Sequence, residues 1–159
     1  MLGCILEDKL MNDALFVEHC TLELFSELVM AIHSEANQYG EEIPETTYFG
    51  RSIKSILKEA NALLEDARKA LNKGKNDWED RYDKALLFLV EQNKAIAYGL
   101  QNIEARYPYI FDNACYEVNS EDFFQNVGAV EFSAGLNPYD FLGIEKPELV
   151  KDVINSYIS

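Results

Sequence analysis

The sequence predicts an all-α protein, a bundle of three long helices followed by a loop-rich C-terminal region with shorter helices. Two observations support this fold class. Apolar residues recur every three or four positions through most of residues 13–106, which is the period of a helix with one buried face. Between the periodic segments lie only short polar stretches that contain Gly or Pro, so neighbouring helices are expected to pack side by side.

The first helix is predicted from about Asp13 to Tyr39. Asp13 is a residue type that caps helix starts, and Gly40 is a typical stop. The apolar stripe of this helix consists of Leu15, Leu22, Phe25, Val29, Ile32, Ala36 and Tyr39. Because Phe16, Leu24 and Leu28 lie off that stripe, we expect neighbours on more than one side and a central position in the bundle.

After a polar loop over 40–47, a second helix is predicted from about Phe49 to Asn72 and a third from about Asp77 to Arg106. Asn76 and Glu79 form a capping-box pattern before the third helix, and Pro108 is expected to end it. The short connection predicts an antiparallel hairpin of these two helices. The expected stripes are Ile53, Ile56, Ala60, Leu63, Ala67 and Leu71, then Trp78, Tyr82, Leu86, Leu89, Ile96, Leu100 and Ile103, with Asn93 interrupting the second stripe.

The region after Pro108 is broken into short pieces by Gly and Pro. Ser120 is a candidate cap for a helix through about Asn126, and a short extended stretch over Cys115–Val118 is an alternative to helix there. Asn137-Pro138 and Lys146-Pro147 each have the pattern of a helix start, and a last helix from Pro147 to Ile158 should dock on the bundle. We therefore predict one domain over 1–159, with a three-helix core over 13–106 and an acidic aromatic segment plus C-terminal helix over 107–159.

The charge balance limits the classes of partner. The chain has 28 acidic and 14 basic residues and a formal net charge of −14, which disfavours binding to nucleic acid or anionic membranes. The negative electrostatic field of such a chain attracts basic proteins and metal cations. The simplest alternative explanation of the charge is that the acidic residues keep the protein soluble. We expect a cytoplasmic protein for three reasons. The three cysteines have no C-x-x-C spacing, the sequence shows no signal-peptide pattern, and no apolar run has membrane-spanning length.

The clearest functional signal is a segment over 107–145 that has no Lys or Arg, yet has seven acids and nine aromatics. Acidic and aromatic side chains together are typical of a surface that binds a basic protein. We expect the phenylalanines Phe111, Phe123, Phe124 and Phe132 to be mainly core. The candidate partner-binding residues are Tyr109, Asp112, Tyr116, Glu117, Glu121, Asp122, Tyr139 and Asp140.

Patterns for catalysis are weak. His19 and Glu23 lie one helical turn apart and could both reach a metal ion, but His33 lies about 21 Å further along the helix axis. The stripe that contains them is expected to be a boundary or solvent-facing one. The sequence does not show the spaced carboxylate pairs that hold Mg²⁺ between facing helices. The cysteines also lack a paired base that could activate them as nucleophiles. We expect no catalytic residue, metal or cofactor.

These observations favour an acidic protein-binding inhibitor. The expected type is an immunity or antitoxin-type protein that blocks the basic active site of a nuclease-like toxin by steric and electrostatic masking. A toxin that binds nucleic acid must be basic, so an acidic antidote fits it. The alternatives are a metal-dependent helical-bundle enzyme and an acidic adaptor or chaperone.

Overall fold

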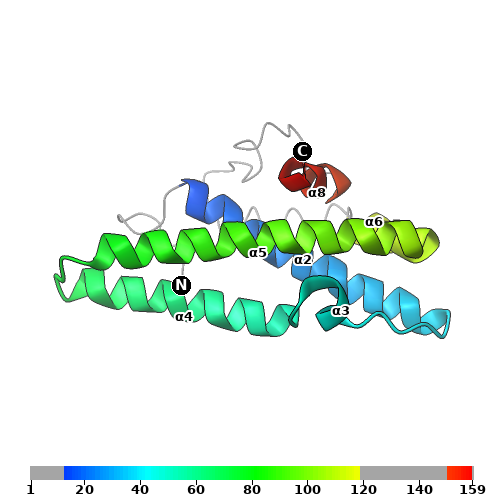
Figure 1. Cartoon of the computed structure of the whole chain (residues 1–159), viewed down its shortest axis with the longest axis horizontal. Helices are drawn as coiled ribbons and strands as arrows, with labels where there is room; N and C mark the ends of the chain where they lie inside the picture. Colours follow the sequence, from blue (N-terminus) through cyan, green and yellow to red (C-terminus); the bar gives the residue numbers. More distant parts are fainter. Residues whose placement is uncertain (1–12, 119–149, 159) are drawn as a thin grey trace.

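A computed structural model describes residues 13–118 and 150–158, and every element in these two ranges is a helix (Figure 1). This confirms the all-α prediction. The helices are α2 (Asp13–Gln38), α3 (Glu45–Phe49), α4 (Ile53–Asn72), α5 (Trp78–Arg106), α6 (Pro108–Val118) and α8 (Val150–Ile158). In the described ranges, none of them is both long and apolar enough to cross a membrane.

Helix α2 has neighbours on several sides, as its apolar pattern predicts. It packs against α5 and α6, and more lightly against α4. Leu24 and Leu28, which lie off the main stripe, are as fully buried as Leu22 and Phe25 on it. The prediction that Tyr39 belongs to the stripe is wrong: α2 ends at Gln38, and Tyr39 is 58% exposed because it lies in the turn that follows.

The turn between α2 and α4 contains the short helix α3, which the sequence pattern did not predict. Phe49 was expected to begin the second long helix, but it ends α3, and Gly50 follows in the left-handed region with φ 79°. Helix α4 begins only at Ile53, because the Ser52 side chain caps it by accepting a hydrogen bond from the Ser55 backbone N–H. The predicted loop over 40–47 is therefore helical from residue 45.

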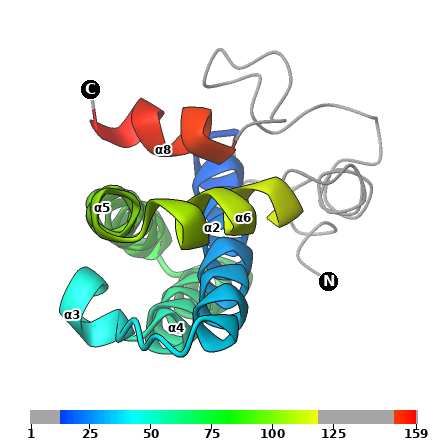
Figure 2. The same cartoon turned by 90° about the vertical axis from the view of Figure 1, so that its right-hand side faces the viewer.

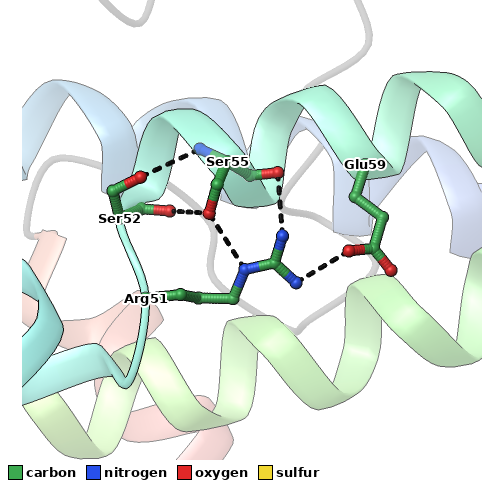
Figure 3. A network of polar contacts seen from close by, with 4 residues as sticks. All are labelled: Arg51, Ser52, Ser55 and Glu59. Carbon is green, nitrogen blue, oxygen red and sulfur yellow. Dashed lines mark hydrogen bonds and ion pairs between the residues drawn. The ribbon is translucent and has the colours of Figure 1, made fainter.

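Arg51 fixes the bend at the start of α4 (Figure 3). Its guanidinium donates to the Ser55 hydroxyl and carbonyl, and it pairs with Glu59 two turns into the helix. The same guanidinium lies 5.9 Å from the ring centroid of Phe88 on α5. These contacts join the bend to the neighbouring helix, and they explain why this Arg is not a free surface cation.

Helices α4 and α5 form the predicted antiparallel hairpin and run side by side along the molecule (Figure 1). The chain reverses at Gly74, which has φ 70°. The predicted capping box is wrong in detail: Asp77, not Asn76, precedes the helix, and its side chain makes no cap hydrogen bond. The Asp77 carboxylate instead pairs with Arg81 one turn later, which also pairs with Asp66 of α4.

The C-terminal region begins with helix α6, which follows closely after α5 in the chain. Pro108 ends α5 as predicted, but it also begins α6, where a proline at the first position costs no hydrogen bond. The alternative of an extended stretch over Cys115–Val118 is wrong, because these residues are the last turn of α6. Viewed down the long axis, α6 leads from the end of α5 across α2 (Figure 2).

Helix α8 docks on α5 and touches α6, as the apolar pattern of the last segment predicts. Val150, Val153 and Ile154 are buried in this contact. The ring of Tyr157 meets Phe25 of α2 edge to face, with centroids 6.0 Å apart. The predicted helix starts at Ser120, Asn137-Pro138 and Lys146-Pro147 lie outside the described residues.

Candidate functional site

The acidic aromatic surface predicted from the sequence centres on α6, whose inner face anchors it to the bundle. Its buried residues, spaced as one helical face, are Ile110, Phe111, Ala114, Cys115 and Val118. This apolar face packs on α2, and Phe111 is only 1% exposed. The prediction that Phe111 belongs to the core is thus confirmed, while Phe123, Phe124 and Phe132 lie outside the described residues.

The outward face of α6 carries four of the eight predicted partner-binding residues. We call it the α6 face, and it consists of Tyr109, Asp112, Asn113, Tyr116 and Glu117. Their spacing of three, four, seven and eight positions places them on one side of the helix. Tyr109 is 80% exposed and Tyr116 is 85% exposed, so almost the whole of each ring meets solvent. The other four predicted residues, Glu121, Asp122, Tyr139 and Asp140, lie outside the described residues.

The α6 face is acidic at its middle and its end. Helix α6 contains Asp112 and Glu117 and has no Lys or Arg of its own. Exposed tyrosines offer large flat surfaces with a polar edge, and carboxylates beside them attract guanidinium and ammonium groups. The face therefore has the chemistry of a contact surface for cationic side chains.

One carboxylate of the face already has a cationic partner. Lys151 of α8 donates a 2.7 Å hydrogen bond to Asp112, and its ammonium lies 3.2 Å from Glu104 of α5. These contacts raise the pKa of Lys151, with the hydrogen bond to Asp112 as the largest cause. The sequence pattern missed this pairing, because Lys151 is 39 positions from Asp112 and outside the base-free segment.

The acidic residues near α3 do not all remain available for a partner. Glu41 and Glu42 are exposed. Glu45 instead accepts a 2.7 Å hydrogen bond from the Ile53 backbone N–H at the start of α4, and its other oxygen lies 3.0 Å from the His33 ring. Glu45 therefore has a structural role in this bend.

Each of the two histidines of α2 lies beside one glutamate, His19 beside Glu23 and His33 beside Glu45. His19 Nδ1 lies 2.9 Å from Glu23 within α2. The stripe was expected to be a boundary or solvent-facing one. Met30, which lies on the same stripe, is 61% exposed as expected, but His19 is only 7% exposed, so the expectation is wrong at His19. Within residues 13–118 and 150–158, no group of three or more His, Cys, Asp or Glu side chains is arranged to hold a metal ion.

A partly buried polar cluster joins α2, α5 and α8, and its one signal in the sequence is Asn93, which interrupts the apolar stripe of α5. The Asn93 amide nitrogen donates to the backbone carbonyl and the carboxylate of Glu18, at 2.9 and 3.0 Å. Tyr157 donates a 2.7 Å hydrogen bond to the same carboxylate. Burial first, and then the Glu18 charge, raise the pKa of Tyr157, so its hydroxyl remains a donor. This cluster fixes how α8 docks.

The two described cysteines are buried on α2 and α6. Burial raises the pKa of Cys115 to about 12, and Glu104 and Asp112 act in the same direction, while Lys151 opposes them. A thiol of this kind is almost wholly protonated at neutral pH and is a poor nucleophile. Cys115 is therefore a packing residue under the α6 face.

The chain has no match among protein-family models, curated proteins or solved structures. Proposals about its function therefore rest on the arrangement of its own side chains.

Proposed function

We propose that this protein is an acidic inhibitor that binds a basic protein through the α6 face. In its specific form, the proposal is an immunity or antitoxin-type protein that covers the basic active site of a nuclease-like toxin. The observation that carries the proposal is the outward side of α6, where two tyrosines at least 80% exposed lie beside carboxylates on a helix without a base.

Physical chemistry supports such a face as a contact surface. Large rigid side chains contribute much of the energy at protein interfaces, because they bury a large area and lose few rotamers. Complementary charge speeds association and selects against acidic partners. Because α6 is anchored by five buried residues, the face is held in place before a partner arrives, and binding needs little ordering of the chain.

An adaptor that binds apolar segments is the second candidate, and exposed apolar side chains on α5 favour it. Leu87 is 58% exposed, Val90 37% and Tyr98 43%. The two candidates differ in their response to salt. An acidic inhibitor should associate more slowly as salt rises, whereas an adaptor that binds through apolar contact should tolerate salt.

A pull-down from the host cell at low salt tests the proposal, provided that the captured proteins are identified. We expect a basic protein to be captured, and the Tyr109→Ala/Tyr116→Ala double variant and the Glu117→Lys variant to lose it. The matched control is Glu91→Lys, which changes the net charge equally at an exposed position on α5. Equal capture by the wild type and all three variants would contradict binding through the α6 face. Association that does not slow as salt rises would favour the adaptor instead.

A further inference from the structure

The corner between α5, α6 and α8 holds a cationic side chain from the protein itself. The Lys151 ammonium lies 2.7 Å from Asp112 and 3.2 Å from Glu104. It also lies 5.6 Å from the ring centroid of Phe111, close enough for a cation–π contact. Two carboxylates and the face of one ring, all from two helices, thus surround one ammonium group from a third.

The Lys151 contacts have the features of an exchangeable cation site. The side chains of Lys151, Asp112 and Glu104 are 41%, 58% and 42% exposed, so water and a competing cation can reach all three. Exposed ion pairs are weak, because solvent and salt screen them. Two carboxylates face one ammonium, so the corner remains negative by one charge while Lys151 is bound.

Contacts other than those of Lys151 also hold α8 on the bundle. Val150, Val153 and Ile154 are buried against the bundle, and Tyr157 is hydrogen-bonded to Glu18. Lys151 can therefore leave Asp112 by rotating its side chain, without undocking of the helix. Displacing Lys151 from both carboxylates costs two exposed ion pairs, those with Asp112 and with Glu104.

We propose that Lys151 is an autoinhibitory cation, which occupies on Asp112 and Glu104 the position that a Lys or Arg side chain of the basic partner takes in the complex. This inference rests on the proposed function and names the chemistry recognised at its centre. Asp112 lies on the α6 face, three positions after Tyr109 and four before Tyr116, so a cation bound there is flanked by both exposed rings. A partner must displace the Lys151 ammonium before its own Lys or Arg side chain can pair with Asp112. A weakly basic protein does not displace it.

A labelled hexa-arginine peptide tests the site directly, by fluorescence anisotropy at 0.1 M salt. Lys151→Gln should bind the peptide about fivefold more tightly than the wild type, the scale of one unit-charge contact in a water-like environment. The matched control is Lys84→Gln, which makes the same charge change about 30 Å from Glu104 along α5, well beyond the screening length. The Lys151→Gln/Asp112→Asn double variant should lose the gain.

Equal peptide affinity of Lys151→Gln and Lys84→Gln, at unchanged melting temperatures, would overturn the inference. The host partner from the pull-down separates this failure from that of the proposed function. If Glu117→Lys weakens the partner while Lys151→Gln binds it no more tightly than the wild type, the inference fails and the proposed function stands. If no basic partner exists but the peptide gain is observed, the proposed function fails and the exchangeable cation site stands.

Discussion

The Tyr157 hydroxyl donates a 2.7 Å hydrogen bond to the Glu18 carboxylate, and so joins α8 to α2 across 139 positions of the chain. The Asn93 amide of α5 donates to the same carboxylate oxygen. Three helices therefore meet at one carboxylate. Since α8 is short, this polar contact and its few buried apolar side chains determine where it docks.

Replacing Tyr157 with Phe should lower the free energy of unfolding by about 1–2 kcal/mol, because a hydrogen bond to a charged acceptor is lost while the ring stays. The edge-to-face contact with Phe25 is retained. Urea unfolding measures the change. The control is Tyr109→Phe, which removes the same hydroxyl from an 80% exposed ring and should change stability by less than about 0.5 kcal/mol. Similar effects of the two variants would show that the contact with Glu18 contributes little.

Glu45→Ala should destabilise the protein by about 1–2 kcal/mol, because its carboxylate accepts from the Ile53 N–H at the first turn of α4 and also meets His33. Glu41→Ala removes an exposed acid from the same turn and should have little effect. Thermal unfolding of both variants tests the contrast. Glu45→Gln should recover part of the loss, since an amide oxygen can still accept the Ile53 hydrogen bond.

The helices were predictable where a long amphipathic pattern repeats, and the bend was not. Residues 13–38, 53–72 and 78–106 each contain enough turns for the three-to-four-residue period to be recognised. Helix α3 has only five residues, too few to show a period. Burial of Phe49 depends on close approach to Gly99 of α5, a contact between residues 50 positions apart that no local pattern indicates.

The residue types of the candidate site could be predicted from the sequence, but the partners of its acidic side chains could not. The difference between Phe111 and the two tyrosines follows from the hydroxyl group, and the structure places the ring of Phe111 inside and those of Tyr109 and Tyr116 outside. Which acids are free depends on tertiary contacts. Glu45 serves the α4 cap and Asp112 holds Lys151, and both partners come from other elements of the fold.

Gly99→Ala should destabilise the protein, although Ala is about 1 kcal/mol better than Gly inside a helix. A Cβ at this position would lie 2.5 and 2.7 Å from two ring carbons of Phe49 and would also meet the Tyr48 carbonyl, so α3 would have to move away from α5. We expect a net loss of about 1–3 kcal/mol.

Chemical denaturation measures the Gly99→Ala effect, and the sign of the change is the test. Ala95→Gly is the control on an exposed position of α5, with an expected loss of about 0.5–1 kcal/mol from propensity alone. A Gly99→Ala variant that is more stable than the wild type would contradict the close packing of α3 on α5.

Cys115 should make stability fall at alkaline pH. Its pKa is raised from 9.0 to about 12 by burial, so above pH 9 the unfolded chain loses this proton and the folded protein keeps it. The folded state then binds more protons than the unfolded state, and the free energy of unfolding decreases as pH rises from about 9 towards 12. By pH 10.5 the loss from this group should be about 1–2 kcal/mol.

Urea unfolding of the wild type and of Cys115→Ala between pH 8 and pH 11 isolates the contribution of Cys115. Lysines and tyrosines titrate in both proteins, so their effects largely cancel in the difference. The stability of Cys115→Ala should be lower at pH 8, because a small cavity replaces the thiol, and should decline less steeply above pH 9. Parallel curves for the two proteins would show that this thiol is not desolvated under the α6 face.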